Sequence, residues 1–527
     1  MEPNLNSANY CQATLVAALC DPARYPHSAD YVEHLQTHIS HVLLVGDYAY
    51  KIKKPLDLGF LDFTSLAHRK TYCEEELRLN RRLAPDIYMD CIPICGSVEN
   101  PILAGDPANA LEYAVKMRRF PQSALLDQSL AAGVLKTAHI DNLAKQLANF
   151  HDSVARAPIE QSFGFPEQVQ QPALDNFTQT RPLLQDSEDL QLLDQLEQWT
   201  IAAYQQLHPI LMARKTGGFI RECHGDLHLG NMLLRDGQIT VFDCIEFNDD
   251  FRWIDVMSDL GFLLMDLHHR QAPNLAWRLL NEYLECSGDY AGLAVLPYYQ
   301  IYRALVRAKI AAIRASQADL DLRTEAQAEC RSYLRLAWQF TQAHTSFLLI
   351  THGVSGSGKS TITAQLLATL GAIRIRSDVE RKRLFGLKPL ESSDSTLNQG
   401  LYTADVGAKT YQRLQELSGQ ILNAGYPVLV DATFLQLAQR QAFRALADKL
   451  SAPFVLLACT ADPATLRNRV EQRKQRGEDA AEADVSVLEQ QLRHSTAPTA
   501  EENPLPATGK DTATLTQAVL ARVSSSR

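Results

Sequence analysis

Residues 353–360 read Gly353-Val-Ser-Gly-Ser-Gly-Lys-Ser360, and this stretch decides the fold of the C-terminal part of the chain. It fits the pattern G-x-x-x-x-G-K-[ST], in which glycines let backbone N–H groups point inward at phosphate oxygens. An apolar run (Phe347–Ile350) precedes it and a helical run (Thr361–Leu370) follows it, as such a loop requires. The pattern predicts a nucleotide site made by Gly353, Ser355, Gly356, Ser357, Gly358, Lys359, Ser360 and Thr361.

Four side chains in this region suit the charge of phosphoryl transfer. We expect Lys359 to neutralise the β- and γ-phosphates of ATP and Ser360 to ligate Mg²⁺. Arg469 and Arg473 are i,i+4 neighbours on one predicted helix face. There they can stabilise the negative charge that develops during transfer, and the alternative for them is a solvated basic face.

Apolar runs that lead into carboxylates predict a parallel sheet. The strands 373–375 and 428–430 lead to Asp378 and Asp431, and helical stretches separate successive strands. Carboxylates at the C-terminal ends of parallel strands lie beside the phosphate loop. We expect Asp378 to orient or deprotonate an attacking hydroxyl and Asp431 to hold Mg²⁺ or its water. The alternative for each is a helix N-cap.

With these motifs, residues 346–495 resemble P-loop kinases of the polynucleotide-kinase, zeta-toxin and gluconate-kinase type. In that group the Asp of an S-D-x-x-R segment acts at the acceptor hydroxyl, and arginines of a lid close over ATP. The run Ser377–Arg381 matches the first motif, and Arg469 and Arg473 match the second. The resemblance implies a phosphotransferase and leaves its acceptor open.

A second cluster of polar residues surrounds the run Cys223–Asn231, which reads C-H-G-D-L-H-L-G-N. Asn231 follows Asp226 by five residues, and an apolar strand further on ends in Asp243. Asp226 can accept the proton of a substrate hydroxyl, while Asn231 and Asp243 can hold Mg²⁺ against the phosphates of ATP. Protein kinases use the same logic in H-R-D-x-x-x-x-N and D-F-G. Gly225 stands where the H-R-D motif has its arginine. We therefore expect no activation by a phosphorylated loop that binds an arginine at this position.

This segment resembles the aminoglycoside and choline phosphotransferase family, whose signature is H-G-D-x-x-x-x-N followed by a strand that ends in Asp. The resemblance covers about residues 35–340 and is strongest over 220–262. It implies that residues 111–117 link two lobes and contact adenine, and that an Asp buttresses the catalytic loop. For that structural task we favour Asp259 over Asp255.

Kinase chemistry of this kind also needs a lysine on a strand of the small lobe and a glutamate on the helix that follows. Lys51 and Lys53 lie on the same face of one predicted strand. Glu76 shares a helix face with Leu79 and should point inward. We expect Lys51 to pair with Glu76 as part of the nucleotide site. Lys53 and Glu75 remain the alternatives, as does a solvated charge run.

The predicted fold is both α/β and α+β. A bilobal kinase-like domain over residues 1–343 has a small β-rich lobe at about 35–120 and a larger helical lobe at about 121–343. A P-loop domain with a parallel α/β sheet follows at 344–495. Residues 496–527 are rich in Thr, Ala, Pro and Ser, which predicts a partly flexible tail, with a closing helix over Ala513–Val523 as the alternative.

The composition is that of an ordinary globular protein, with 46% hydrophobic and 21% charged residues among 527. The net charge of −10 gives no general attraction to nucleic acid or to an anionic membrane. Apolar runs are far shorter than the roughly 18–20 residues of a membrane-spanning helix. The N-terminal residues do not read as a secretory signal, and the ten cysteines lack C-x-x-C pairs. These features predict a cytoplasmic protein with reduced thiols.

Together the two clusters predict two ATP- and Mg²⁺-dependent phosphotransferase sites in one chain, an order that resembles a bacterial bifunctional arrangement. We expect each to transfer the γ-phosphate of ATP to hydroxyl groups of small molecules. Nucleic acid is not an expected acceptor, although it stays open for the C-terminal domain. The alternative from another class is a nucleotide-binding regulatory or sensing protein, in which one domain is inactive or only hydrolyses ATP.

Overall fold

The structure is a computed structural model that describes residues 5–59, 61–343, 345–389, 391, 403–476 and 480–525. The chain forms two compact units. The first comprises Met1–Asn142, Ser153–Val169 and Leu211–Leu263, and the second comprises Leu143–Asp152, Gln170–Ile210 and Leu264–Arg527. Much of the expected helical lobe therefore belongs to the same compact unit as the P-loop region. The domain boundary at 343–344 stays a prediction from the sequence.

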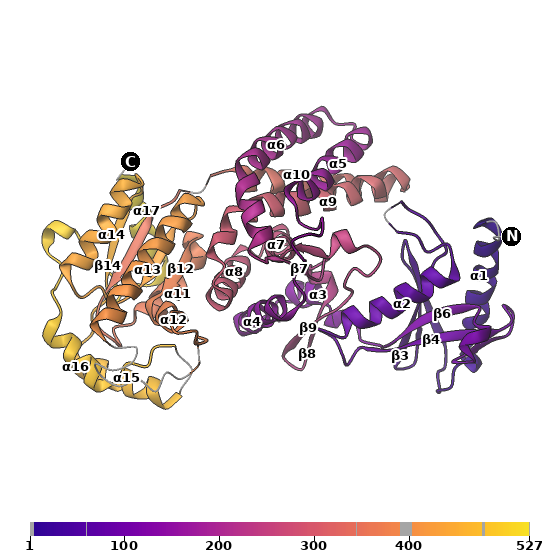
Figure 1. Ribbon diagram of the computed structural model, residues 1–527, viewed down its shortest axis with the longest axis horizontal. Coiled ribbons are helices and arrows are strands. Elements are labelled where there is room, and N and C mark those ends of the chain that lie inside the picture. Colours follow the sequence, from indigo (N-terminus) through magenta and orange to yellow (C-terminus); the bar gives the residue numbers. More distant parts are fainter. Residues whose placement is uncertain are drawn as a thin grey trace. The chain divides into compact units, whose positions relative to one another are not determined.

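A six-stranded antiparallel sheet with the order β1-β2-β3-β6-β4-β5 lies in the first unit (Figure 1). Strands β2 and β3 form a hairpin that turns at Gly46 and Asp47, with Val45 opposite Tyr48. Gly46 has a φ of 56°, a backbone region that glycine enters without steric cost. The strands are β1 (Val32–Gln36), β2 (Ser40–Val45), β3 (Tyr48–Lys53), β4 (Tyr88–Gly96), β5 (Pro101–Leu103) and β6 (Glu112–Arg118).

Helix α2 (Leu66–Asn80) packs against β4 and β6 of this sheet. It begins at a serine N-cap, where the Ser65 hydroxyl accepts a hydrogen bond from a first-turn N–H group. Cys73, Glu76 and Leu79 are buried on one helix face at a spacing of three residues. The expectation that Glu76 points inward is therefore confirmed. Helix α1 (Leu5–Leu19) precedes the sheet in the chain.

Two short antiparallel pairs hold the segment that contains Asp226. In one, β7 (Ile220–Glu222) pairs with β10 (Trp253–Asp255), and in the other, β8 (Met232–Arg235) pairs with β9 (Gln238–Val241). The loop from β7 to β8 carries Asp226 and Asn231, and Asp243 follows the end of β9. Short strands thus fix both ends of the predicted catalytic loop.

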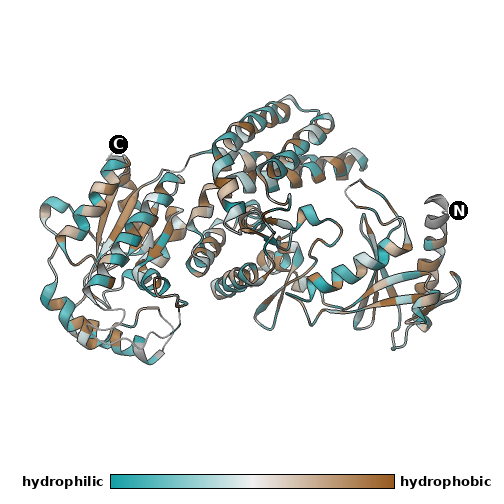
Figure 2. Ribbon diagram, viewed as in Figure 1, coloured by the Kyte–Doolittle hydropathy of each residue, from teal (hydrophilic) through white to brown (hydrophobic). Residues whose placement is uncertain are grey.

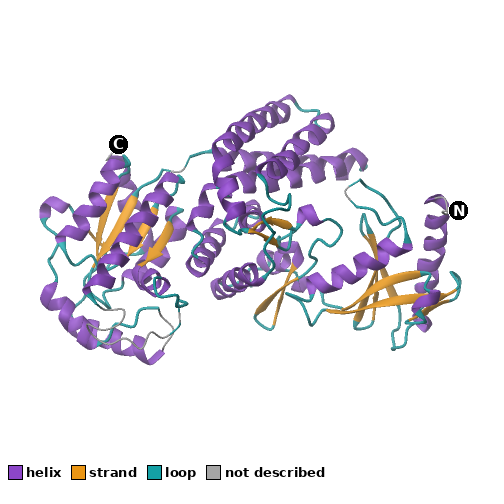
Figure 3. Ribbon diagram, in the orientation of Figure 1, coloured by secondary structure: helices purple, strands orange, loops and turns teal. Residues whose placement is uncertain are grey.

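Helices make up most of the chain between β6 and residue 343 (Figure 3). The larger lobe is therefore helical, as predicted, and α9 packs along α10. None of the helices in the described ranges combines the length and apolar character needed to cross a lipid bilayer. The helices are α3 (Leu126–Ala131), α4 (Thr137–Ser153), α5 (Pro166–Thr180), α6 (Ser187–Thr216), α7 (Val256–His269), α8 (Pro273–Ser287), α9 (Leu296–Gln317) and α10 (Leu320–Thr341).

The second unit contains a five-stranded sheet with the order β12-β13-β11-β14-β15, and every neighbouring pair is parallel. The predicted parallel α/β fold is therefore confirmed. Strands β11 and β13 are buried throughout, and Figure 2 shows apolar strands between helices that carry hydrophilic residues. The elements are β11 (Leu348–His352), α11 (Lys359–Leu370), β12 (Ile373–Arg376), α12 (Ser377–Arg383), α13 (Ala404–Asn423), β13 (Val428–Asp431), α14 (Leu437–Lys449), β14 (Phe454–Ala458), α15 (Pro463–Arg476) and α16 (Val485–His494).

The C-terminal residues complete this sheet instead of forming the partly flexible tail expected for 496–527. Strand β15 (Leu505–Pro506) pairs with β14, and helix α17 (Thr512–Ser525) packs against α11. Leu515, Val519 and Val523 recur at i, i+4 and i+8, so they form an apolar stripe that joins the core of the sheet. The polar composition of the segment made this stripe hard to recognise in the sequence. The closing helix that was given as the alternative is present as α17.

Candidate active sites

Two lysines of β3 meet the same glutamate of α2. Lys51 Nζ lies 2.8 Å from Glu76 Oε1, and Lys53 Nζ lies 2.7 Å from Glu76 Oε2. Lys51 Nζ also lies 2.8 Å from Asp243 Oδ1, whereas Lys53 contacts Glu246. The expected pair of Lys51 and Glu76 is therefore formed, and so is the alternative pair of Lys53 and Glu76. The two lysines differ in the second carboxylate that each one reaches.

Burial and ion pairing compete in this cluster. Burial would raise the pKa of the Glu76 carboxyl, but Lys51 and Lys53 hold it below its usual range. Burial would lower the pKa of Lys51, but Asp243 and Glu76 raise it well above its ordinary value. The Glu76 carboxylate and the Lys51 ammonium are therefore both charged at neutral pH. Asp243 is the solvent-exposed end of the cluster, with 41% of its side chain exposed, whereas Lys53 is fully buried.

The catalytic-loop residues Asp226 and Asn231 are in direct contact. The Asn231 side-chain amide donates to Asp226 Oδ2 at 2.9 Å and to the Asp226 carbonyl at 3.0 Å. His228 Nε2 lies 3.4 Å from Asp226 Oδ2 while its ring packs near Phe262. Gly225 has a φ of 89°, and a Cβ there would lie 2.6 Å from the Phe251 carbonyl oxygen. Backbone geometry thus explains why glycine stands where protein kinases have arginine.

Asp259 accepts two hydrogen bonds from the backbone of this loop. The N–H groups of His224 and Gly225 donate to its two carboxylate oxygens at 3.0 Å and 2.9 Å. Asp259 is completely buried. Asp255 instead forms a two-pronged ion pair with Arg214. The prediction that Asp259 buttresses the loop is therefore confirmed.

Replacing Asp259 by alanine is expected to destabilise the first unit. The substitution removes the acceptor of two buried N–H groups, and unpaired buried groups cost about 1–3 kcal/mol each. Calorimetric unfolding of Asp259→Ala should show the loss as a lower transition temperature. Asp259→Asn retains one acceptor oxygen and should lose about half as much. Equal stability of the alanine and asparagine variants would contradict this account.

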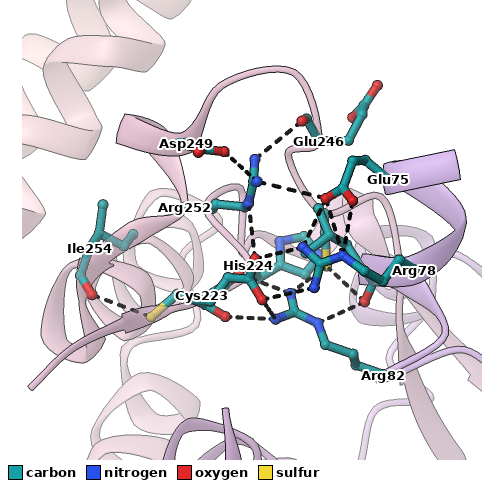
Figure 4. A network of polar contacts seen from close by, with 12 residues as sticks. Glu75, Arg78, Arg82, Cys223, His224, Glu246, Asp249, Arg252 and Ile254 are labelled. Atoms are coloured by element: carbon teal, nitrogen blue, oxygen red, sulfur yellow. Dashed lines mark hydrogen bonds and ion pairs between the residues drawn. The ribbon is translucent and has the colours of Figure 1, made fainter. Parts of the chain in front are cut away.

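Arginines from α2 and from the loop before β10 converge on Glu222, directly before the predicted catalytic loop, and Figure 4 shows Arg78, Arg82 and Arg252 close to Cys223 and His224. Arg78 Nη2 lies 2.7 Å from Glu222 Oε1, and Arg252 Nε lies 3.4 Å from the same oxygen. Arg82 donates to the carbonyl oxygens of Glu222 and Cys223 at 2.8 Å and 3.1 Å. These contacts tie α2, and with it Glu76, to the loop.

Glu75 belongs to this arginine network. Its Oε2 lies 2.8 Å from Arg78 Nη2 and 3.8 Å from Arg252 Nη2. Glu75, the alternative partner for Lys51, therefore faces the arginines (Figure 4). Analysis of the sequence missed the network, because its members are up to about 180 residues apart and follow no local pattern.

The segment that carries Asp243 is held by two side chains that sequence analysis also missed. The Asp243 N–H donates to the Tyr88 hydroxyl at 3.2 Å, and the Cys244 N–H donates to Asn80 Oδ1 at 2.8 Å. Asn80 also donates to the Glu76 carbonyl at 2.9 Å, so it links α2 directly to this segment. Asp243 has a φ of 63°, a left-handed conformation that Asp tolerates better than most residues.

A cavity of about 520 Å³ lies beside the loop 353–360. Its lining brings together ten of the residues predicted for this site, while Gly353 and Ser357 belong to the loop without lining the cavity. The residues that line it are Ser355, Gly356, Gly358, Lys359, Ser360, Thr361, Ser377, Asp378, Arg381, Asp431, Thr433, Arg469, Gln472, Arg473, Ala481, Ala483 and Gln491.

The phosphate loop needs its first glycine for close approach. A Cβ at Gly353 would lie 2.4 Å from the carbonyl oxygen of Cys459. Any other residue at this position would therefore require a shift of the backbone. Lys359 Nζ donates to the Val354 carbonyl at 2.9 Å. Burial lowers the pKa of Lys359, and Asp431 opposes that shift. The lysine is thus folded over the loop, close to a strand-end carboxylate.

The other charged residues of this cavity also have partners. Arg381 Nη1 donates to Asp378 Oδ1 at 3.2 Å. Arg469 donates to the Gly356 carbonyl at 3.1 Å, and Arg473 to the Ala483 carbonyl at 2.8 Å. Both predicted lid arginines therefore reach the cavity from α15.

Gln491 of α16 was not predicted for this site. Its Oε1 accepts a hydrogen bond from the Ser355 N–H at 2.7 Å. Sequence reasoning could not have found it, because it follows Ser355 by 136 residues and no motif contains it.

The donor atoms at both sites fit a magnesium ion. Asn231 and Asp243 offer amide and carboxylate oxygens, and Ser360 and Asp431 offer hydroxyl and carboxylate oxygens. Hard oxygen ligands of this kind are those that Mg²⁺ prefers. Asp431 is nearly buried and lies 3.4 Å from the Thr363 hydroxyl and 3.9 Å from Arg376 Nε, so its carboxylate is held at the cavity wall.

Comparison with known proteins identifies both parts of the chain. Residues 60–296 match the model of the phosphotransferase enzyme family, and residues 348–498 match that of an AAA domain. These matches confirm both resemblances seen in the sequence. The chain thus carries a stretch that matches the phosphotransferase enzyme family, followed by a stretch that matches an AAA domain.

Relatives share this arrangement over most of their length. The chain is 29% identical over 459 residues to uncharacterized proteins of Mycobacterium tuberculosis and Mycobacterium bovis, covering 87% of this chain and 89% of each relative.

Three solved structures also align with the chain. A choline/ethanolamine kinase family protein from Mesorhizobium loti aligns at 13% identity and a TM-score of 0.38, over 63% of this chain and 98% of that one. The GDP complex of aminoglycoside 2'-phosphotransferase-IIIa aligns at 17% and 0.38, over 61% and 98%. A gluconokinase from Sinorhizobium meliloti aligns at 20% and 0.25, over 34% and 94%.

Proposed function

We propose that the chain is a bifunctional kinase, with two sites that each transfer the γ-phosphate of ATP to a hydroxyl group of a small molecule. The observation that carries this proposal is the cavity at the loop 353–360. One lysine, two carboxylates and three arginines line it, and its volume of about 520 Å³ is in the range of nucleotide-sized pockets. The positive side chains suit the phosphates of a nucleotide, and the carboxylates suit a metal ion and a hydroxyl acceptor. A cavity without a ligand would have no use for so many charged groups.

At the P-loop site, the backbone N–H groups of the loop and Lys359 would bind the phosphates. Asp378 would accept the proton of the attacking hydroxyl, and Arg469 and Arg473 would stabilise the charge that develops on the transferred group. Ser360 and Asp431 would hold Mg²⁺, which neutralises phosphate charge when bound. Asp378 suits its role because it lies in the first turn of α12 at the cavity wall, paired with Arg381.

At the kinase-like site, Asp226 would accept the hydroxyl proton, and its contact with Asn231 would orient it. Asn231 and Asp243 would hold Mg²⁺, and Lys51 would bind ATP phosphates while Glu76 fixes its position. Lys51 suits this role better than Lys53, because Lys51 reaches the half-exposed Asp243 and Lys53 reaches the buried Glu246. We assign Lys53 to the structure of the small lobe.

The cytoplasm is the compartment that this proposal requires, since ATP and Mg²⁺ are abundant there. The ten cysteines of the chain, all of them free thiols, agree with a reducing compartment. The acceptors are hydroxyl-bearing small molecules, and no charge pattern in the chain favours nucleic acid.

The direct test is transfer of γ-labelled phosphate from ATP to a small-molecule extract. Wild type, Asp226→Ala and Lys359→Ala are compared side by side. A labelled product lost in only one variant assigns a kinase to that site. Loss of all products in each folded variant would refute two independent sites. ATP binding without any transferred label would instead favour the nucleotide-sensing alternative.

Lys51→Met should mainly lower activity, whereas Lys53→Met should mainly lower stability. Lys51→Met is expected to lower transfer at the kinase-like site about 100- to 1000-fold, because it removes a phosphate-binding charge. Lys53→Met leaves Glu246 and Glu76 with less compensating charge at a fully buried position, which costs about 3–5 kcal/mol. Transfer assays and calorimetric unfolding of both variants check this.

The double variant Lys53→Met with Glu246→Gln is the matched control. It removes the buried carboxylate together with its partner, so it should regain part of the lost stability. If Lys53→Met abolished transfer at unchanged stability while Lys51→Met remained active, the two assignments would have to be exchanged.

A further inference from the structure

Helix α8 covers the open edge of the parallel sheet (Figure 1). Strand β12 is the edge strand, so its outward backbone groups have no neighbouring strand to pair with. The Asn281 side chain donates to the Ala372 carbonyl at 3.0 Å and accepts from the Arg374 N–H at 2.7 Å. Helix α8 lies in the stretch that matches the phosphotransferase family, whereas β12 lies in the stretch that matches the AAA domain.

One carboxylate of α8 binds two arginines of β12. Glu285 Oε1 lies 3.0 Å from Arg376 Nη1, and Oε2 lies 3.2 Å from Arg374 Nη2. Glu285 is 8% exposed. Burial would raise the pKa of the Glu285 carboxyl, but the two arginines hold it below its usual range. A buried charge with two such partners is ordered, and losing it leaves two arginines without their shared counter-charge.

The same residue contacts both ends of α12, the short helix that begins with Ser377 and Asp378. Arg376, which Glu285 holds through its side chain, is the N-cap of α12. At the other end, Arg383 Nη2 donates to the backbone carbonyl of Glu285 at 2.6 Å. Arg376 Nε also lies 3.9 Å from Asp431 Oδ2. Through Arg376, Glu285 is therefore linked to both carboxylates of the cavity, Asp378 in the first turn of α12 and Asp431.

We propose that Glu285 is a positioning residue for phosphoryl transfer at the P-loop site, acting through Arg376 and α12 on Asp378. This inference rests on the function proposed for that site. It means that a residue of the phosphotransferase-family stretch sets the geometry of the P-loop active site. That site is then complete only when both parts of the chain are present.

Turnover and nucleotide affinity should respond differently to this residue. Glu285 touches α12 and β12, and the phosphates would be bound by Lys359 and the loop 353–360 instead. A change at Glu285 should therefore lower the rate of transfer while the affinity for ATP stays the same. A general loss of folding would instead lower both.

The test uses the full chain with Asp226→Ala as background, so that ATP turnover reports the P-loop site. The probe is Mg-ATP without an added acceptor, with water as the attacking group, and Lys359→Ala gives the zero level. Glu285→Gln is expected to lower kcat about 10- to 100-fold, with KM for ATP changed by less than about twofold. Glu282→Gln is the matched control, because Glu282 is on the same helix and lies 3.5 Å from Arg374, one of the two arginines that Glu285 binds.

Hydrogen exchange of residues 377–383 gives a second readout that does not depend on activity. Glu285→Gln should accelerate exchange in α12, and Glu282→Gln should not. Should Glu285→Gln fail to fold, Arg376→Gln breaks the same link while Glu285 keeps its pair with Arg374, and it should show the same effects.

Unchanged kcat and exchange in Glu285→Gln, or parallel changes in kcat and KM, would overturn the inference. The absence of Lys359-dependent turnover in the background protein would refute the proposed function of the site. In that case faster exchange of α12 in Glu285→Gln alone would still support the positioning role, and unchanged exchange would overturn it as well.

Discussion

Replacing Lys359 by alanine is expected to lower ATP turnover at the P-loop site about 100- to 1000-fold, the usual effect of removing one stabilising charge from a transition state. Lys359 is buried in the cavity wall, and its ammonium lies against the Val354 carbonyl at 2.9 Å. A small swing of this flexible side chain would bring it to the phosphates of a bound nucleotide. Steady-state turnover of Mg-ATP in the Asp226→Ala background measures the loss.

Lys449→Ala is the matched control for this substitution, because Lys449 is an exposed lysine of the same unit at the end of α14. It should retain full turnover. Transfer at the kinase-like site should also be unchanged in Lys359→Ala when Asp226 is intact. Turnover within about threefold of the background protein would show that Lys359 does not act on the phosphates, since a lost charge at that place costs far more.

Replacing Asp226 by asparagine is expected to lower transfer at the kinase-like site about 100- to 10,000-fold, the range that general-base catalysis provides. Asparagine keeps the size of the side chain and one oxygen that can accept from Asn231, so the loop should stay folded. The amide cannot take up the hydroxyl proton. Initial rates with the labelled acceptor, once it is isolated from the extract, give the ratio.

Asp30→Asn provides the comparison for Asp226→Asn, because Asp30 is an exposed aspartate of the same unit and precedes Asp226 by 196 residues. Its transfer rate should equal that of wild type. A rate for Asp226→Asn close to wild type would exclude Asp226 as the base. It would also make the contact of Asn231 with Asp226 a structural one.

Features coded within a few residues could be predicted from the sequence. The phosphate loop depends on such local spacing, and it is present in the structure. The role of Asp259 came from the family resemblance instead, because the N–H groups that it accepts lie 34 and 35 residues earlier. The tail could not be predicted well from composition, because three apolar residues spaced by four determine where α17 packs. A short apolar stripe has little weight in an average over polar residues.

The choice between Lys51 and Lys53 could not be made from the sequence, for a geometric reason. Side chains of a strand alternate with a period of two, so both lysines point to the same face. What separates them is contact with Asp243 or Glu246, each about 190 residues further along. The link from Glu285 to Arg376 is hidden in the same way, since it joins two stretches that match different families.

The position of β15 and α17 has a consequence for how the protein is made. A ribosome synthesises the chain from its N-terminus, and domains generally fold as they emerge. The P-loop sheet cannot close until late in this manner, because its edge strand β15 and the helix that covers α11 are translated after all its other strands. Until residues 505–525 have left the ribosome, β14 presents an unpaired edge and α11 an uncovered apolar side, and both are sites for aggregation. Nascent chains stalled before residue 505 should therefore bind chaperones, whereas chains in which residues 505–525 have emerged should not.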